Sequence, residues 1–355
     1  MIAKKFICCL FIVVSLVSKG QVNEDSIFNS IKNQLTDLPN NFYLAIALVQ
    51  KDKVYHLGFK KQQDTVYSIT LSDTLFEIGS ITKTFTATLL AQELIAQKIK
   101  ATDYINKVYP FKFNNKIKLT YLSLCNHTAG LYRLPSNMSA HLFNRPKNPY
   151  SVYNHLALEE YLKKELTLDQ DNIGKLSYSN LGAGLLGYTL AKKEKTAIEL
   201  LTKEKILDSY LMSSTAYHTP TSIAGLDKQG NPTPNWNMNA LKAAGGLIST
   251  TNDLSKLIKA HFNVNNKALA LTRKPTYAAN KKRAIGMGWM INNPETEKEI
   301  FWHNGGTGGF SSCLSFSTRK KTGAIVLSNI SRNHQQAQLI DQLCFELIYQ
   351  LNNSN

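Results

Sequence analysis

Cysteine is scarce in this chain of 355 residues, which contains only five. Cys8 and Cys9 lie in an apolar stretch near the N-terminus, and Cys125, Cys313 and Cys344 are far apart, with no Cys-x-x-Cys spacing. A disulfide framework needs an even set of paired cysteines, and a cysteine zinc site needs clustered thiolates. The sequence therefore predicts neither of these.

Acidic residues are also few: 25 Asp and Glu stand against 41 Lys and Arg, which gives a formal net charge of +16. The basic residues occur in scattered pairs and triplets without interleaved aromatic residues, so we expect no binding to nucleic acid. A solvated basic surface is the simpler interpretation, and weak attraction to an anionic cell-envelope polymer is the alternative. The 43% hydrophobic and 19% charged residues exclude a disordered or collagen-like chain.

The apolar run at residues 6–17 is too short for a membrane-spanning helix, which needs roughly 20 residues. It follows Lys4 and Lys5 and precedes a Ser-Lys-Gly segment, which is the layout of a secretory signal peptide. We therefore expect residues 1–20 to be removed and the protein to be periplasmic or secreted. Residues 21–355 are expected to form a single domain and a monomer.

Strand patterns occur near both ends of the chain, and helix patterns occur between them. This order predicts one antiparallel sheet built from both chain ends and flanked by helices, with an inserted, mainly helical lobe at roughly residues 100–285. The expected strands are 42–49, 54–59, 286–291, 300–303, 310–316 and 324–327, and the expected helices are 80–98, 158–166, 181–192, 197–208, 253–262 and 335–351.

Ser80 and Lys83 form a Ser-x-x-Lys pattern at the start of a predicted helix. Residues three positions apart lie on one face of a helix, so the ammonium of Lys83 can reach the hydroxyl of Ser80. A serine hydroxyl is a weak nucleophile until a base activates it, and a lysine serves only when its pKa falls from about 10.4. The alternative is an N-cap serine beside an exposed lysine.

Two further short patterns, Tyr-Ser-Asn at 178–180 and His-Asn-Gly at 303–305, also have near copies elsewhere. A second Ser-x-x-Lys at 317–320 lies between two predicted strands, in a polar segment typical of a hairpin turn. Tyr104 begins a second Tyr-x-Asn, and Lys321 begins a literal Lys-Thr-Gly. The patterns alone do not choose between these copies.

Five segments, in this order, resemble the penicillin-recognising serine hydrolases, the family of class C β-lactamases, serine D-alanyl-D-alanine carboxypeptidases and related esterases. The resemblance runs from about Phe42 to the C-terminal helix and implies the α/β (α+β) fold of β-lactamases and penicillin-binding proteins. The segments are FEIGSITKTF (76–85), LCNHTAGL (124–131), YSNLG (178–182), AGGLIST (244–250) and HNGGTGGF (303–310).

The family pattern also separates the true motifs from their copies. Its third motif is followed by Thr-Gly-Gly-Phe, which is found only after His303-Asn304-Gly305, so Lys321 is interpreted as a turn residue. Tyr104 follows too soon after the serine helix and is interpreted as structural.

The resemblance implies that Ser80 attacks an amide or ester carbonyl and becomes acylated, while Lys83 and Tyr178 share the proton transfers. The sequence leaves open whether Lys83 or Tyr178 is the base. A phenol ionises near pH 10, so Tyr178 can be the base only if neighbouring cations lower its pKa.

The resemblance also assigns substrate binding to Asn180, His303, Asn304, Gly305 and Gly306. Asn180 would donate its amide to the substrate and hold the lysine. The backbone N–H groups of the serine and of Gly306 would form the oxyanion hole, on a strand edge without side chains.

The sequence departs from the class C lactamases at His303 and Asn304, where those enzymes carry lysine and threonine. A histidine is mostly neutral at pH 7, whereas a lysine is a permanent cation for a substrate carboxylate. A β-lactam, a D-alanyl peptide and an ester therefore all remain candidate substrates, with an esterase or other amidase, or a non-catalytic envelope-binding protein, as the alternatives. We expect no cofactor and no metal, because no histidine pair has metal-ligand spacing.

Overall fold

The computed structural model describes residues 17–18, 21–22, 24–138, 147–217 and 219–353. The predicted signal peptide, residues 1–20, lies outside the described residues except for β1 (Val17–Ser18), which pairs with β2 (Gln21–Val22). All residues predicted to form the site are described.

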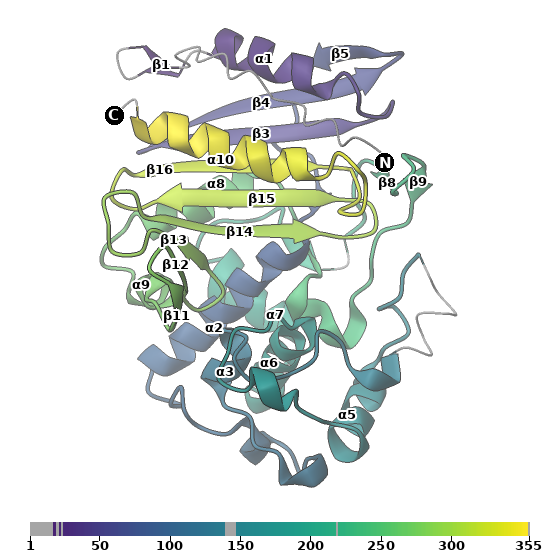
Figure 1. Cartoon of the computed structure of the whole chain (residues 1–355), viewed down its shortest axis with the longest axis vertical. Helices are drawn as coiled ribbons and strands as arrows, with labels where there is room; N and C mark the ends of the chain where they lie inside the picture. The colour runs from purple at the N-terminus through teal and green to yellow at the C-terminus, as the bar shows by residue number, and fades with distance from the viewer. Residues whose placement is uncertain (1–16, 19–20, 23, 139–146, 218, 354–355) are drawn as a thin grey trace, which may run out of the picture.

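Nine antiparallel strands form one sheet in the order β11-β12-β13-β14-β15-β16-β3-β4-β5 (Figure 1). The C-terminal strand β16 pairs with the N-terminal strand β3, so the prediction of one sheet built from both chain ends is confirmed. The strands are β3 (Tyr43–Gln50), β4 (Lys53–Gln62), β5 (Thr65–Ser68), β11 (Tyr277–Asn280), β12 (Arg283–Ile285), β13 (Met290–Asn292), β14 (Ile300–Gly306), β15 (Ser311–Ser317) and β16 (Thr322–Ser328).

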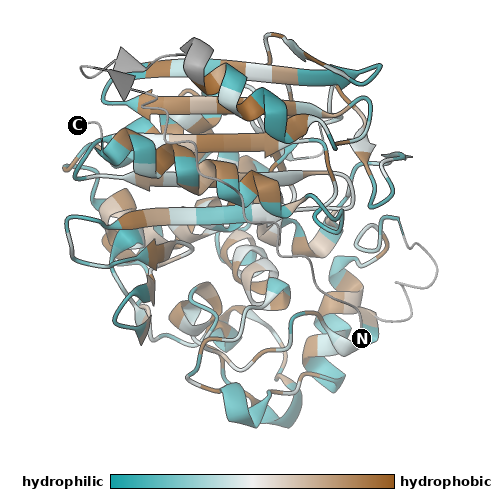
Figure 2. Ribbon diagram, turned by 45° about the horizontal axis from the view of Figure 1, so that its top comes forward, coloured by the Kyte–Doolittle hydropathy of each residue, from teal (hydrophilic) through white to brown (hydrophobic). Residues whose placement is uncertain are grey.

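Both faces of the central strands are buried, which explains their nearly continuous apolar sequence. Side chains alternate between the faces of a strand. In β3, Ile46 and Leu48 join the core beneath α1 (Glu24–Lys32) and α10 (Gln338–Asn353), whereas Ala45 and Ala47 join the core toward the helical lobe. Figure 2 shows hydrophobic (brown) stretches along the strands of the sheet and also on the helices beside them.

Helices cover the two faces of the sheet (Figure 1). On the lobe side, α8 (Thr251–His261) contacts β3 and β16, and α2 (Thr82–Ile95) leads away from the sheet into the lobe. No helix in the described part of the chain is long and apolar enough to cross a membrane. The other α-helices in the described ranges are α3 (Tyr121–Cys125), α5 (His155–Lys164), α6 (Asn180–Lys193), α7 (Ile198–Thr202) and α9 (Lys267–Arg273).

A three-stranded sheet connects the lobe to the main sheet. Its order is β6 (Phe76–Glu77), β10 (Leu247–Ser249) and β7 (Ala216–Tyr217), and both pairs are antiparallel. A separate hairpin pairs β8 (Gly225–Leu226) with β9 (Pro232–Thr233). Because β6 directly precedes the Ser80 helix, this small sheet helps to fix the position of that helix.

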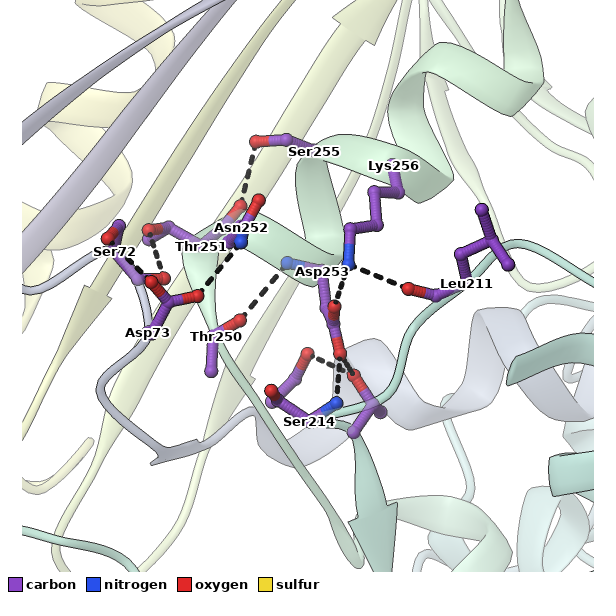
Figure 3. A network of polar contacts seen from close by, with 12 residues as sticks. Ser72, Asp73, Leu211, Ser214, Thr250, Thr251, Asn252, Asp253, Ser255 and Lys256 are labelled. Carbon is purple, nitrogen blue, oxygen red and sulfur yellow. Dashed lines mark hydrogen bonds and ion pairs between the residues drawn. The ribbon is translucent and has the colours of Figure 1, made fainter. Parts of the chain in front are cut away.

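Polar contacts anchor the start of α8 (Figure 3). Thr250 caps the helix, since its hydroxyl accepts a hydrogen bond from the Asp253 N–H at 3.0 Å. The buried Asp253 carboxylate accepts from the Ser214 N–H at 2.8 Å and from Lys256 Nζ at 2.7 Å. These bonds hold the start of α8, which directly follows β10.

One predicted strand is wrong. Residues 286–289, expected to open a strand at 286–291, form a turn in which Gly288 has φ of +75°. A Cβ atom on Gly288 would lie 2.9 Å from the Lys83 carbonyl oxygen, so glycine lets this turn approach α2. The strand there begins at Met290, and the short strands β11 and β12 were not predicted, because short and partly exposed segments lack a clear hydrophobic pattern.

Candidate active site

Ser80 lies in a 3₁₀ turn, η2 (Gly79–Ile81), that leads into α2. Gly79 has φ of +49°, and a Cβ atom there would lie 2.5 Å from the backbone nitrogen of Gly306. Glycine at this position therefore allows the serine turn to pack directly against β14. The N-cap residues of η2 and α2 are Ile78 and Ile81, so the alternative of an N-cap serine at Ser80 is not what the structure shows.

Lys83 is buried one turn further along and makes three polar contacts. Its Nζ lies 2.9 Å from Ser80 Oγ, 2.9 Å from Asn180 Oδ1 and 2.6 Å from the Ala244 carbonyl oxygen. Burial, reinforced by the charge of Arg133, holds the pKa of Lys83 well below its usual range. The structure therefore favours the neutral amine beside the Ser80 hydroxyl.

Tyr178 lies against the same pair of residues. Its phenol shares a hydrogen bond with Ser80, and Lys83 Nζ lies 4.9 Å from the centroid of its ring. Burial raises the pKa of Tyr178 to about 12, and the hydrogen bond with Ser80 and the charge of Arg133 only partly offset this. The phenol therefore keeps its proton at neutral pH.

The start of α6 sets the position of Asn180. Ser179 is the N-cap residue, since its hydroxyl accepts from the Gly182 N–H at 2.9 Å, so Asn180 is not needed as a cap. Besides its contact with Lys83, Asn180 donates from Nδ2 to the Tyr150 hydroxyl at 3.2 Å. The predicted contact between Asn180 and the lysine is therefore present.

The edge of β14 opens next to Ser80. The pairing of β13 with β14 ends at Trp302, so the edge is unpaired on that side from His303 to Gly306. On the other side, the Thr307 N–H donates to the Phe310 carbonyl of the hairpin, and antiparallel alternation then directs the Gly306 N–H toward the open edge. A Cβ atom on Gly305 would lie 2.0 Å from the Ile78 carbonyl oxygen, which accounts for the bare strand.

His303 is buried and neutral. Its Nδ1 lies 2.6 Å from the Asn304 carbonyl oxygen, which can only accept, so Nδ1 carries the proton and Nε2 is an acceptor. Nε2 is buried without a hydrogen-bond partner in the described structure. Burial is the main cause that lowers the pKa of His303 to about 3, and Lys83 adds to this shift only while its amine is protonated.

Asn304 faces the opposite side of β14. Its Nδ2 donates to Asp341 Oδ2 of α10 at 2.9 Å, and the same oxygen accepts from Arg332 at 2.6 Å. The side chain of Asn304 is therefore not brought together with Ser80, because neighbouring residues of a strand point to opposite faces. Only its backbone lies on the open edge.

The near copies of the motifs lie elsewhere. Ser317 ends β15, and Lys321 lies in the hairpin turn before β16 with φ of +53°, as predicted for a turn. Tyr104 is 42% exposed and contacts Lys118, so it lies on the surface.

Two side chains that contact Tyr178 were not predicted. The ring of His127 lies 4.5 Å from the Tyr178 ring, centroid to centroid, and its Nδ1 accepts from the Ser179 N–H at 3.3 Å. The guanidinium carbon of Arg133 lies 5.3 Å from the same ring centroid. His127 belongs to the LCNHTAGL segment, but the sequence assigned it no role, and no local pattern marks Arg133.

Glu77 is a third residue that the sequence did not assign. Its buried carboxylate accepts from Asn235 Nδ2 at 3.0 Å, from the Trp236 N–H at 2.5 Å, and from the Thr307 hydroxyl. Burial raises the pKa of Glu77, while the three hydrogen bonds oppose this. Glu77 thus joins the strand before Ser80 to the turn after β14 and to a lobe loop.

The chemistry of this site rests on side chains and backbone donors. Within the described ranges, no group of three or more His, Cys, Asp or Glu residues could hold a metal ion. Cys125, Cys313 and Cys344 are free and buried. The arrangement is a serine beside a desolvated amine, with a phenol and an open strand edge next to it.

Known proteins resemble this chain in sequence and in fold. The family model described as Beta-lactamase matches residues 44–346. A β-lactamase of Providencia stuartii is 31% identical over 62% of this chain, a match that spans 54% of the relative, or about half its length. A β-lactamase of Pseudomonas fluorescens is 25% identical over 84% of this chain and 90% of the relative.

The fold likeness extends over nearly the whole chain. A crystal structure described as a β-lactamase/D-alanine carboxypeptidase from Pseudomonas syringae superposes with a TM-score of 0.75 at 20% identity, covering 93% of this chain and 98% of that one. This confirms the predicted fold. With the family model matching most of its length, the chain belongs to the β-lactamase family of serine hydrolases.

Proposed function

We propose that this protein is an exported serine hydrolase that forms an acyl-enzyme on Ser80 and acts on β-lactam or D-alanyl-type amides. The observation that carries the proposal is the buried contact of Lys83 Nζ with Ser80 Oγ at 2.9 Å, within the Ser80, Tyr178 and Asn180 arrangement. A serine becomes a nucleophile when a neutral base within hydrogen-bond distance can take its proton.

Lys83 is the base in this proposal. A neutral amine has two N–H donors and one lone pair, and both the Asn180 Oδ1 and the Ala244 carbonyl can only accept. The two donors are therefore used on these oxygens, and the lone pair is directed at Ser80 Oγ. Tyr178, with its pKa raised to about 12, starts as a neutral phenol and is a poor first base.

The reaction then proceeds in two halves. Ser80 Oγ bonds to the substrate carbonyl carbon as its proton passes to Lys83. When the bond to the leaving nitrogen breaks, that nitrogen takes a proton from Tyr178, which recovers one from Lys83. Water then attacks the acyl-serine, its proton returns through the same groups, and Ser80 leaves with a proton.

Backbone donors stabilise the oxyanion in this proposal. The first N–H groups of a helix have no intrahelical acceptors, which leaves the Ser80 N–H available. The Gly306 N–H points to the open edge of β14, beside the Gly79 turn. Two such donors next to the nucleophile suit a tetrahedral oxyanion.

An esterase is the second candidate, and the neutral state of His303 favours it. An imidazole whose pKa is lowered to about 3 adds no charge for a substrate carboxylate at neutral pH, and an ester needs none.

Mass spectrometry of residues 21–355 after brief exposure to benzylpenicillin tests the proposal. An adduct mapped to Ser80, absent from S80A, is expected, together with opened penicillin in solution. A rapidly lost adduct indicates a lactamase, and a persistent one a carboxypeptidase. No adduct and no opened penicillin would contradict the amide proposal, and hydrolysis of short-chain esters by the wild type but not by S80A would then establish the esterase.

Export, a monomeric state and weak attraction to anionic envelope polymer are parts of the same proposal. Export is supported by Lys4, Lys5 and the apolar run at 6–17. The attraction is supported by the formal charge of +16, which becomes +13 when Lys4, Lys5 and Lys19 are removed with residues 1–20. The mass of the protein recovered from outside the cytoplasm should correspond to a chain that starts near Gln21. Full-length mass in that fraction would contradict cleavage.

A further inference from the structure

An exposed cation, Arg133, lies beside the site on a loop whose backbone the fold anchors. Arg133 is exposed, and its guanidinium carbon lies 5.3 Å from the centroid of the Tyr178 ring. Its backbone carbonyl accepts from the N–H groups of Asn180 and Leu181 at 3.0 and 3.1 Å. The loop that carries Arg133 is therefore bound to the same helix start that presents Tyr178 and Asn180.

The preceding residue strengthens this anchor. The Tyr132 carbonyl accepts from Ser179 Oγ at 2.7 Å, so two successive carbonyls of the loop are held by the first residues of α6. Among the described residues, no carboxylate pairs with Arg133. A guanidinium that is held beside a reactive phenol and lacks an internal anion is available to bind one from outside.

The other basic groups of the site do not have this freedom. Lys83 is buried and uses its amine on Ser80, Asn180 and Ala244. His303 is buried, with Nδ1 bonded to the Asn304 carbonyl. Arg332 is tied to Asp341 on the opposite face of β14.

We propose that Arg133 is a specificity-determining residue that binds a carboxylate on the leaving group of the substrate. Tyr178 shares a hydrogen bond with Ser80 and supplies the proton to the leaving group, so a cation against its ring lies on the side from which that group departs. This inference rests on the proposed function, since it names what the site selects in its substrates. The cation that class C lactamases carry on the third motif would here come from the loop after α3.

Binding to an inactive variant tests this inference separately from turnover. The probes are benzylpenicillin, whose carboxylate is on the ring that bears the leaving nitrogen, and benzylpenicillin methyl ester. In S80A, calorimetry should show a preference for the free acid of about tenfold or more, as a charge-assisted pair provides. In S80A/R133Q the two affinities should become similar, and in S80A/R133K part of the preference should remain.

The control is S80A/K32Q, which removes an exposed charge from α1, on the far side of the sheet. It should keep the preference of S80A, and added salt should weaken that preference in both proteins. An unchanged preference in S80A/R133Q, or no preference in S80A, overturns the inference. Failure of the proposed function is recognised differently, as the absence of a Ser80 adduct in the wild-type protein.

Discussion

The same four-residue pattern, Ser-x-x-Lys, occurs in two regions of this molecule with different results. At Ser80 it begins a helix, and the amine of Lys83 is buried against the hydroxyl. At Ser317 it ends a strand, and the Ser317 hydroxyl accepts from the backbone N–H of Lys320 at 3.4 Å in a hairpin turn. Whether the serine of this pattern lies beside a neutral amine therefore depends on burial of the lysine and on carbonyl acceptors for its N–H groups. Residues outside the motif provide both.

Replacing each serine in turn should give the largest difference between the two copies of the pattern. S80A should lower turnover of whichever substrate is found by about a thousandfold or more, because the acyl-enzyme can no longer form. S317A should leave turnover within about twofold, since its hydroxyl has no part in the site. Steady-state kinetics with matched circular dichroism spectra checks both variants, and equal activity of S80A and wild type would remove the mechanism.

Removing each lysine should give the next largest difference. K83A should lower kcat by about a hundredfold or more, the usual contribution of a general base, and K320A should have little effect. In the wild type the pKa of Lys83 is lowered, so the active neutral amine is present above that pKa and is lost as pH falls below it. The rate should then drop about tenfold per pH unit.

The pH profile also tests Tyr178. Because burial raises its pKa to about 12, no alkaline loss of rate should occur between pH 8 and 10. A decline centred near pH 10 would show an unperturbed phenol. K320A should keep the profile of the wild type.

The sequence was sufficient to predict the fold and to name the proposed reacting groups, but not the environment of the site. Ser80, Lys83 and Tyr178 lie in contiguous motifs, and the sheet follows from strand patterns near both chain ends. Tyr150 and Arg133 have no local signal, because their roles arise from contacts with residues 30 or more positions away. The opposite orientation of Asn304 follows from strand alternation, once the register of β14 is known.

Glu77 tests how far the Ser80 motif depends on its surroundings, because its hydrogen bonds hold the strand that precedes Ser80. The Glu77 carboxylate accepts hydrogen bonds from three donors, and in E77Q the new amide NH₂ would face one of them. Two buried donors that face each other lower the free energy of unfolding by about 1–3 kcal/mol. We expect a lower thermal midpoint together with a lower kcat/KM, because Thr307, which donates to Glu77, directly follows Gly306, the proposed oxyanion donor. E165Q, at the exposed end of α5, should change stability by less than about 0.5 kcal/mol. Equal effects of E77Q and E165Q would show that the hydrogen bonds of Glu77 do not stabilise the Ser80 motif.

The smallest effect concerns the neutral state of His303, which separates this site from one with a lysine cation. Its pKa is about 3 in the folded protein and about 6.5 in the unfolded chain, so only the unfolded chain takes up a proton as pH falls below 6.5. The stability that this histidine contributes is complete above that value and is lost toward pH 3. The loss between pH 8 and 5.5 is about 1.4 kcal/mol.

Urea denaturation at these two pH values measures the loss. H303Q should reduce the pH dependence of the unfolding free energy by about that amount, because glutamine does not titrate. H155Q removes an exposed histidine at the start of α5 and should leave the dependence unchanged. The same dependence in H303Q and wild type would mean that His303 takes up its proton in the folded site as readily as in the unfolded chain, in which case it would supply a second cation to the site, beside Arg133, below about pH 6.5.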